Sequence, residues 1–446
     1  MANTDLVQKL NSPDWNQWRD SNPDVAIDLR QAALAGLDLS GRNLSGADLR
    51  KAQLSSANLS GADLSRAKLS GATLSKVRFD KANLSEAVLD DAVTSQLSFK
   101  GAELEGASLR GLSLIATNFK HANLVRADLS DCELSGSIFT EARLDNARLR
   151  QTKLNGVSAP GASFNGVDGE GCECQESMLR GSSFVGARFK DAKFNQSNCT
   201  EADFSKAELA ATWFQDASLA DAKFHDAKLT SVNFKNAFLS DTQFVGARFK
   251  KVNFFKARLK DTSFKNVNGT GLDFAGADLR GVDLTGARFH SSDLQLVNME
   301  EKDLRSIELT QSTLTQAKLR KTRFTAGNLS GVDFSDSDLT RADFGSANLN
   351  AASFKKARLN GAIFRNAALN NADLEGADCR NADFRGADMS EASLRDANIK
   401  SCDFNGAQIK GTNFSGTDLR GANIKGLLGV KVRLFAEKVR RLGGGD

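Results

Sequence analysis

Chemically reactive residue types are scarce in this chain. The 446 residues include no tyrosine, and the only three histidines, His121, His225 and His290, lie far apart in the sequence. We therefore expect no histidine cluster and no proton relay. No glycine-rich phosphate loop follows a strand and opens a helix. The sequence predicts a protein that is not an enzyme, with no catalytic residue and no cofactor.

Long apolar runs are absent as well. No run approaches the roughly 18 apolar residues that a membrane-spanning helix requires. The first ten residues, MANTDLVQKL, lack a basic stretch followed by an apolar core, so no secretory signal is predicted. We expect a cytoplasmic bacterial protein without a transmembrane segment, and export by a non-classical route stays open.

Cysteine is present but not in a metal-binding pattern. There are six cysteines, and only Cys172 and Cys174 lie close together in the sequence. Structural zinc sites need two such pairs with matching spacing, and no second pair exists. All six cysteines occupy positions that are apolar or small elsewhere in the chain, so we interpret them as core residues and predict no metal site.

The net charge of +4 comes entirely from the C-terminal residues of the chain. From Lys425 onward there are six basic and two acidic residues, and residues 1–424 hold 53 of each. A balanced surface of this kind has no long-range field that would attract nucleic acid, and none is expected as a direct ligand.

A period of five organises almost the whole sequence. From Leu34 to Ile424 there are 79 positions whose numbers end in 4 or 9, of which 41 are Leu and 26 are Phe. Two residues before each of these central positions stands a small residue, most often Ala. A period of five matches neither a helix nor a flat strand. It fits a chain that turns a corner every five residues, which is a β-solenoid.

Phenylalanine spacing indicates four sides in each coil. Phe164 to Phe264 recur every twenty residues, and so do Phe194 to Phe274, with an offset of ten. Four sides place each series on one wall. Gly169 and Gly269 stand at central positions of the same face, where we expect neighbouring coils to fill the space with Phe189, and with Phe249 and Phe289. The sequence predicts about twenty coils and no projecting loops.

The repeats resemble the pentapeptide-repeat family, whose pattern is A-(D/N)-L-x-x. Ala47-Asp48-Leu49 and Ala342-Asp343-Phe344 are examples, and the resemblance covers residues 34–424. It implies an all-β fold, a right-handed quadrilateral parallel β-helix. The departures from the pattern are Thr94, Ala159, Gly169, Cys174, Cys199, Gly269 and Cys379. Three of them fall in the coil beside Pro160, which we expect to be the least tightly packed and a place where the solenoid could bend.

Both ends are expected to carry short helical caps, because an open solenoid exposes unpaired backbone and core. The predicted domains are a helical cap at 1–33, the solenoid at 34–425 and an amphipathic helix with a tail at 426–446. Trp15 and Trp18 share one helical face and should cover the first coil, or else form a docking site. The C-terminal helix could cap the last coil, pair with a second copy to form a homodimer, or contact an acidic or membrane surface. Its apolar face consists of Leu428, Val432, Phe435, Val439 and Leu442.

Three aromatic residues fall on outward positions and are candidates for binding a protein partner. They are Trp213 and Phe255, which flank central positions of the same face two coils apart, and Phe238, which belongs to the adjacent face. A local basic band is formed by Arg248, Lys250, Lys251, Lys256, Arg258, Lys260 and Lys265. Aromatic and arginine side chains are typical interface anchors, although single exposed apolar residues are also common on ordinary surfaces. The candidate interaction residues are thus Trp213, Phe238, Phe255, Val432, Phe435, Val439 and Leu442.

Three functional hypotheses follow. The first is a non-enzymatic interaction or scaffold protein, a stiff loop-free rod whose outer faces or ends bind a protein partner. The second comes from the family resemblance, which includes proteins that imitate DNA and act on DNA gyrase. The third is a secreted bacterial effector that acts by binding. The charge balance of residues 1–424 weakens the second hypothesis.

Overall fold

The computed structural model of the protein describes residues 4–417 and 421–427. The chain divides into two compact units, unit 1 (Met1–Lys228) and unit 2 (Leu229–Asp446). Among the described residues, no helix combines the length and the apolar character that crossing a bilayer demands.

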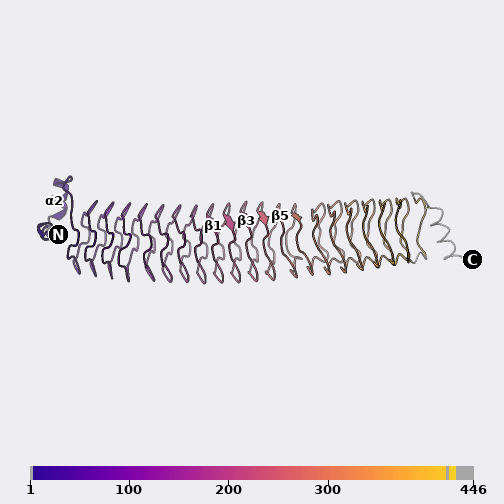
Figure 1. The fold of residues 1–446 in the computed structure, drawn as a ribbon, viewed down its shortest axis with the longest axis horizontal. Helices are drawn as coiled ribbons and strands as arrows, with labels where there is room; N and C mark the ends of the chain where they lie inside the picture. The colour runs from indigo at the N-terminus through magenta and orange to yellow at the C-terminus, as the bar shows by residue number, and fades with distance from the viewer. Residues whose placement is uncertain (1–3, 418–420, 428–446) are drawn as a thin grey trace, which may run out of the picture. The chain divides into compact units, whose positions relative to one another are not determined.

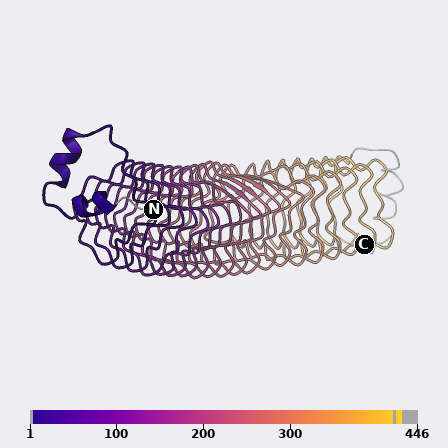
Figure 2. The same cartoon turned by 60° about the vertical axis from the view of Figure 1, so that its left-hand side comes forward.

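Two short helices precede the first coil of unit 1 (Figures 1 and 2). They are α1 (Thr4–Leu10) and α2 (Trp15–Ser21). The Trp15 side chain is fully buried, and its indole Nε1 donates a hydrogen bond to the Asn43 carbonyl at 2.8 Å. The predicted N-terminal cap is confirmed, with Trp15 as the residue that seals the first coil. The helix predicted at the C-terminus falls almost entirely on residues 428–446, which lie outside the described residues.

Parallel backbone pairing at a spacing of twenty residues builds each unit. In unit 1 the pairing starts with Asp28 opposite Asp48, so the coils begin before residue 34, and unit 2 pairs Asp333 with Ser353 in the same way. Within a coil the chain turns after each central residue, as where the Ala52 N–H donates to the Leu49 carbonyl at 3.0 Å. Five residues per side and twenty per coil confirm the predicted four-sided parallel β-helix.

One face of the coils forms short strands. They are β1 (Arg188–Lys190), β2 (Glu208–Ala210), β3 (Lys228–Thr230), β4 (Arg248–Lys250), β5 (Asn268–Thr270) and β6 (Arg288–His290). In unit 1, β1 pairs in parallel with β2. In unit 2, β4, β5 and β6 are successive parallel neighbours. The β1, β3 and β5 labels mark this face in Figure 1.

Stacked phenylalanines fill the interior of both units. In unit 1, the Phe184 and Phe204 rings stack with centroids 4.6 Å apart, and Phe194 stacks on Phe214 at 5.0 Å. The two series meet edge to face, as Phe204 meets Phe214 at an interplanar angle of 84°. Both geometries are favourable for aromatic rings. The predicted assignment of each series to a single wall is therefore confirmed.

The two central glycines are compensated in different ways. A Cβ placed on Gly169 would lie 2.4 Å from the Phe189 ring, so Phe189 fills that space as predicted. A Cβ on Gly269 would instead lie 2.7 Å from Leu272, a large residue at a position that is usually Ala. Phe249 and Phe289 are the backbone neighbours of Gly269 in the adjoining coils, as the sequence predicts. Leu272, three residues further along the same coil, supplies the atoms nearest to the missing Cβ, which the sequence argument did not consider.

Two departures from the repeat have local consequences. A residual cavity of about 10 Å³ lies in the coil near Pro160, lined in part by Leu154, Cys172 and Cys174, which agrees with looser packing there. At Thr94 the side-chain hydroxyl, not the backbone, donates to the Ser113 carbonyl. Within the described part of the chain, Val93 and Ser113 form no bridge, and the Val93 side chain is left exposed.

Candidate functional site

The side chains that could carry chemistry are dispersed or buried. No group of three or more His, Cys, Asp or Glu that could hold a metal ion occurs among the described residues. All six cysteines are free and buried. Burial raises the pKa of the Cys132, Cys199 and Cys402 thiols to about 12, so these thiols stay protonated at neutral pH. They behave as small apolar core residues, as the sequence predicts.

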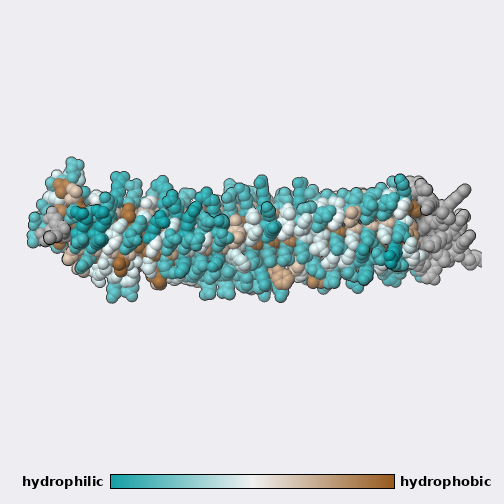
Figure 3. Space-filling model, in the orientation of Figure 1, coloured by the Kyte–Doolittle hydropathy of each residue, from teal (hydrophilic) through white to brown (hydrophobic). Residues whose placement is uncertain are grey.

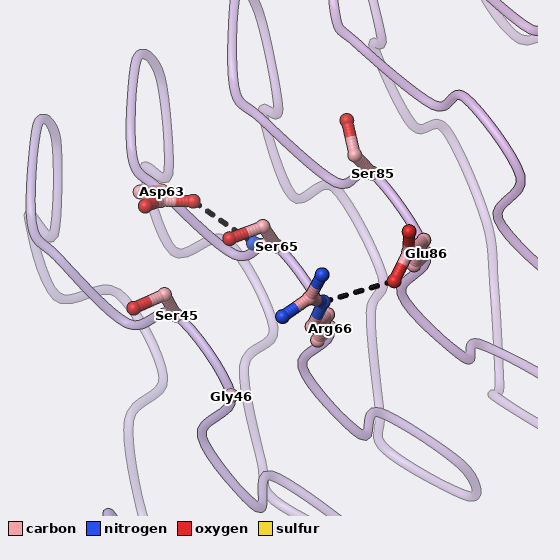
Figure 4. Close-up of a pocket in the computed structure, with 7 residues that line it drawn as sticks. All are labelled: Ser45, Gly46, Asp63, Ser65, Arg66, Ser85 and Glu86. Carbon is pink, nitrogen blue, oxygen red and sulfur yellow. Dashed lines mark hydrogen bonds and ion pairs between the residues drawn. The ribbon is translucent and has the colours of Figure 1, made fainter. Parts of the chain in front are cut away.

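A surface hollow in unit 1 illustrates how outward polar groups are used (Figure 4). The hollow has a volume of about 420 Å³. Across it, Arg66 Nε binds the Glu86 carboxylate at 2.9 Å, while Asp63 accepts a hydrogen bond from the Ser65 N–H at 3.0 Å. Both acids are thus engaged with neighbouring groups of the wall. This arrangement is typical of a solvated surface.

Trp213 ends a ladder of alternating charges on one wall of unit 1. Lys153 binds Glu133 at 3.2 Å, and Lys193 binds Glu173 at 2.8 Å. Lys193 is the backbone neighbour of Trp213 in the next coil. The Lys193 ammonium holds the pKa of the Glu173 carboxyl below its usual value. Trp213 is 45% exposed, so the structure places this predicted residue where a partner could reach it.

Phe238 and Phe255 lie in unit 2, each beside cations. Arg258 stands over the Phe238 ring at 4.4 Å, and Phe238 is 41% exposed. Phe255 is half-buried, with the Lys256 and Lys235 ammonium groups 5.2 Å and 6.0 Å from its ring. Cation–π contacts of this kind place basic side chains beside both rings. The predicted role of these two residues in binding a partner stays a prediction.

We call residues 248–260 the cationic band. The band has the sequence RFKKVNFFKARLK, with six cations and no carboxylate. All six are exposed: Arg248, Lys250, Lys251, Lys256, Arg258 and Lys260. Among the described residues they make one ion pair, Lys260 with Asp261 at 4.0 Å. Twenty residues further on, Asn268, Thr270 and Gly271 carry no charge, whereas Asp278 follows Arg258 and Arg280 follows Lys260.

A lysine at an inward position interrupts the backbone ladder next to the band. Lys302 is the only charged residue at the small positions between 47 and 417. Its Nζ donates to the Val282 carbonyl and, at 3.2 Å, to the Arg280 carbonyl. In the regular ladder these carbonyls accept from the backbone N–H groups of Asp303 and Asp261, as Thr262 accepts from Asp283 one coil earlier. Burial lowers the pKa of the Lys302 ammonium below its ordinary value of 10.5.

The interruption opens a seam between neighbouring coils. Within the described part of unit 2, the Leu259 and Asp261 N–H groups have no acceptor, and Arg258 forms no bridge with Asp278. A hollow of about 540 Å³ lies there. It is lined by Ala257, Arg258, Leu259, Lys260, Asp261, Asp278, Arg280 and Gly281. The sequence argument missed this seam, although a charged residue at a small position was a visible signal for it.

Other exposed apolar residues were also missed. They are Val93, Ile115, Ile138, Met178 and Leu296, each more than a third exposed. Figure 3 shows that apolar areas on the visible face are small and separated by polar surface. The signal for these residues was an apolar side chain outside the central and small positions. Val432, Phe435, Val439 and Leu442 lie outside the described residues, so their predicted role in binding stays a prediction.

Two family models match the chain. The model described as "Pentapeptide repeat region" matches residues 170–244, 221–288 and 287–364. The model described as "Pentapeptide repeats (8 copies)" matches residues 27–66, 57–93, 98–136, 117–156, 147–184, 362–400 and 387–426. The two models together cover nearly all of residues 27–426. No curated protein matches the chain.

Solved structures with similarity to the chain include several pentapeptide-repeat proteins. A trypsin-treated variant of QnrB1, a plasmid-mediated fluoroquinolone resistance protein, is 17% identical over 45% of this chain and 99% of its own, with a TM-score of 0.34. A protein from the thylakoid lumen of Arabidopsis thaliana is 39% identical over 25% of this chain and 75% of its own, with a TM-score of 0.16. HetL from the cyanobacterium Nostoc, involved in heterocyst differentiation regulation, is 23% identical over 59% and 90%, with a TM-score of 0.14.

Proposed function

The chain belongs to the pentapeptide-repeat family, and from this premise we propose that it is a non-enzymatic interaction protein whose outer walls bind a protein partner. The observation that carries the proposal is that the interior positions are occupied by a few apolar residue types, whereas the outward positions vary. Leu and Phe fill the interior of each unit, so specificity has to come from side chains on the walls. In folds of this type, exposed aromatic and arginine residues are the usual anchors of an interface.

The exposed aromatic residues support this proposal in each unit separately. Trp213 is 45% exposed at the end of a neutralised charge ladder in unit 1, and Phe238 is 41% exposed beneath Arg258 in unit 2. Large aromatic side chains bring much contact area at a low cost in conformational entropy. A partner that covers either of them would bury apolar surface that now faces water.

The second hypothesis, imitation of DNA, has less support. Carboxylates on the walls are largely engaged with cations, as Glu170 is with Lys190 and Glu208 with Lys228, each within 2.8 Å. A DNA-like field needs rows of acids without counter-charges. We therefore keep the interaction protein as the proposed function and let a supercoiling assay with purified gyrase judge the alternative.

A pull-down with the full-length protein tests the proposal. Partners from a lysate of the source cell are identified by mass spectrometry for the parent and for two variants, Trp213→Ala and the double variant Phe238→Ala with Phe255→Ala. We expect at least one partner to be recovered about fivefold less with one of these variants, as is typical of an interface anchor. Val93→Ala serves as a matched control, because it also removes an exposed apolar side chain.

Equal recovery of every partner by the parent and both variants would rule out these residues as anchors. The predicted homodimer through the C-terminal helix is tested separately by sedimentation of the full chain and of a chain that ends at residue 426. If both species sediment as monomers, the dimer is wrong and binding by the walls is unaffected.

A further inference from the structure

Resting on the proposed function, we propose that the seam of unit 2 and the band cations beside it, Lys256, Arg258 and Lys260, form one binding site for an extended acidic segment of a partner protein, with one of its carboxylates in the seam. Three independent features of the described residues converge on this site. They are a concentration of unpaired cations, backbone donors without acceptors, and aromatic rings already covered by cations.

Charge complementarity identifies the partner as acidic. Of the six exposed cations of the band, Lys256, Arg258 and Lys260 lie beside the seam, whereas Arg248, Lys250 and Lys251 belong to the side that comes two sides earlier in the coil. The long Lys260–Asp261 contact of 4.0 Å is the one described ion pair of these three cations. Elsewhere on the walls some cations pair with an acid twenty residues away, as Lys321 pairs with Glu301 at 2.7 Å. Unpaired cations of one sign repel each other, and an acidic ligand relieves that repulsion.

The seam adds donors that a plain basic surface lacks. The Leu259 and Asp261 N–H groups have no acceptor within the described part of unit 2. Backbone N–H groups without partners can bind an incoming acceptor. The seam wall also holds Arg258, Lys260 and Arg280. Hydrogen bonds from such donors to a carboxylate are stronger than neutral ones, so a carboxylate is the ligand group that fits.

Lys302 keeps the seam open. Its ammonium occupies the Arg280 carbonyl, which is the acceptor that the Asp261 N–H would use in an unbroken ladder. The other small positions in the same column include Val282, Thr262 and Thr322, and the two threonines each donate only their hydroxyl to a carbonyl of the preceding coil. Replacement of Lys302 by threonine should therefore return Asp261 to the ladder and close the seam.

The same surface is poorly suited to nucleic acid. Single-stranded nucleic acids bind by stacking bases on open aromatic faces. Arg258 already covers Phe238 at 4.4 Å, and Lys256 stands over Phe255 at 5.2 Å. Asp261 and Asp278 also line the seam and would repel a phosphate backbone. A flexible peptide can place its acids on the cations and leave these two carboxylates uncontacted.

The test measures binding of a fluorescein-labelled peptide of alternating Glu and Gly to the full-length protein by fluorescence anisotropy. The comparison ligands are the same peptide with Gln in place of Glu, and a single-stranded oligodeoxynucleotide of equal charge. We expect the acidic peptide to bind, the Gln peptide not to bind, and the oligonucleotide to bind more weakly than the acidic peptide. Stronger binding of the oligonucleotide would overturn the proposal in favour of a nucleic-acid surface.

Two sets of variants separate the band from the seam. The triple variant Lys256→Gln, Arg258→Gln, Lys260→Gln should weaken peptide binding about tenfold or more, because each contact is charge-assisted. Lys51→Gln, Lys76→Gln, Lys81→Gln is the matched control, since it removes three exposed cations from unit 1. Lys302→Thr should weaken binding severalfold although the band is intact, whereas Lys400→Thr, which removes an exposed lysine of unit 2, should not.

Each of these results tests a separate part of the proposal. Unchanged binding by the triple variant overturns the site, and unchanged binding by Lys302→Thr overturns the role of the seam. Melting curves of all variants show whether they remain folded. If the acidic peptide fails to bind while Phe238→Ala with Phe255→Ala still loses a cellular partner, the inference fails and the proposed function stands.

Discussion

Residues 133–193 of unit 1 and the cationic band of unit 2 use the same coil geometry and differ in how their charges are matched. In unit 1, Glu133, Lys153, Glu173 and Lys193 follow each other at intervals of twenty and form ion pairs between coils. In unit 2, the neighbours of the band at that interval include Asn268, Thr270 and Gly271. Because coils stack at a fixed interval, the charge of a wall depends on residues twenty apart.

The backbone differs between the two regions for a related reason. Beside the unit 1 ladder, Thr152 occupies a small position, and its hydroxyl donates to the Leu129 carbonyl at 2.8 Å without disturbing the coil. At the corresponding kind of position in unit 2, Lys302 is too long and takes carbonyls that the ladder needs. The residue at a single small position thus decides whether the backbone hydrogen bonds between neighbouring coils are complete.

The largest expected effect on stability comes from placing a lysine at a small position of unit 1, as Lys302 stands in unit 2. Thr152→Lys places an ammonium group where the backbone N–H of Lys153 now donates to the Cys132 carbonyl at 2.9 Å. Burying an unpaired charge and breaking this bond should lower the free energy of unfolding by about 3 kcal/mol or more. Urea denaturation measures the change. Gln151→Lys, at the exposed corner beside it, is the control and should change stability little.

The reverse substitution should stabilise the protein. Lys302→Thr removes a partly buried charge and lets Asp261 and Asp303 return to the ladder. We expect a gain of about 1–2 kcal/mol in the free energy of unfolding. Hydrogen exchange followed by NMR or mass spectrometry should show slower exchange of the Asp261 amide. Exchange as fast as in the parent would mean that Lys302 does not hold the seam open.

The gain in the free energy of unfolding from Lys302→Thr should depend on pH. Burial lowers the pKa of Lys302 in the folded protein below 10.5, so the unfolded chain binds more protons between the lowered value and 10.5. The parent therefore gains stability as pH rises through this window, whereas the Thr variant has no such group. The difference in unfolding free energy between the two should narrow toward pH 10.5. A constant difference would show that the Lys302 charge carries no penalty.

The smallest effect on stability should come from removing one ion pair of the unit 1 charge ladder. Glu173→Gln removes one ion pair, in which the Glu173 side chain is 29% exposed, and should cost about 0.5 kcal/mol. Lys193 lowers the pKa of Glu173 below 4.5 in the folded state, so this contribution is present above 4.5 and is lost as pH falls through the lowered value. Thermal unfolding of the parent and variant at neutral and at acidic pH measures this difference.

The interior was predictable because its positions repeat. A central residue every fifth position fixes which side chains point inward, and the twenty-residue Phe series indicates four sides before any coordinates are known. The same logic correctly assigned Phe189 to the space beside Gly169. At Gly269 it did not foresee the contribution of Leu272, because the rule considered only central residues and Leu272 stands at a small position. Helices at the N-terminus were expected because an open solenoid end exposes backbone and core, and the hydrogen bond from the Trp15 indole to the Asn43 carbonyl was visible only in the structure.

The outer walls were less predictable. The sequence identified Phe238, Phe255 and the basic stretch, but the positions of Arg258 and Lys256 over the two rings depend on side-chain conformations. The seam could not be predicted from the presence of Lys302 alone, because the conformation of its side chain decides which carbonyl groups the ammonium binds. The sequence alone therefore determined the coil, because a periodic backbone repeats one packing solution. Tertiary structure decided the site, because long charged side chains choose among several partners in neighbouring coils.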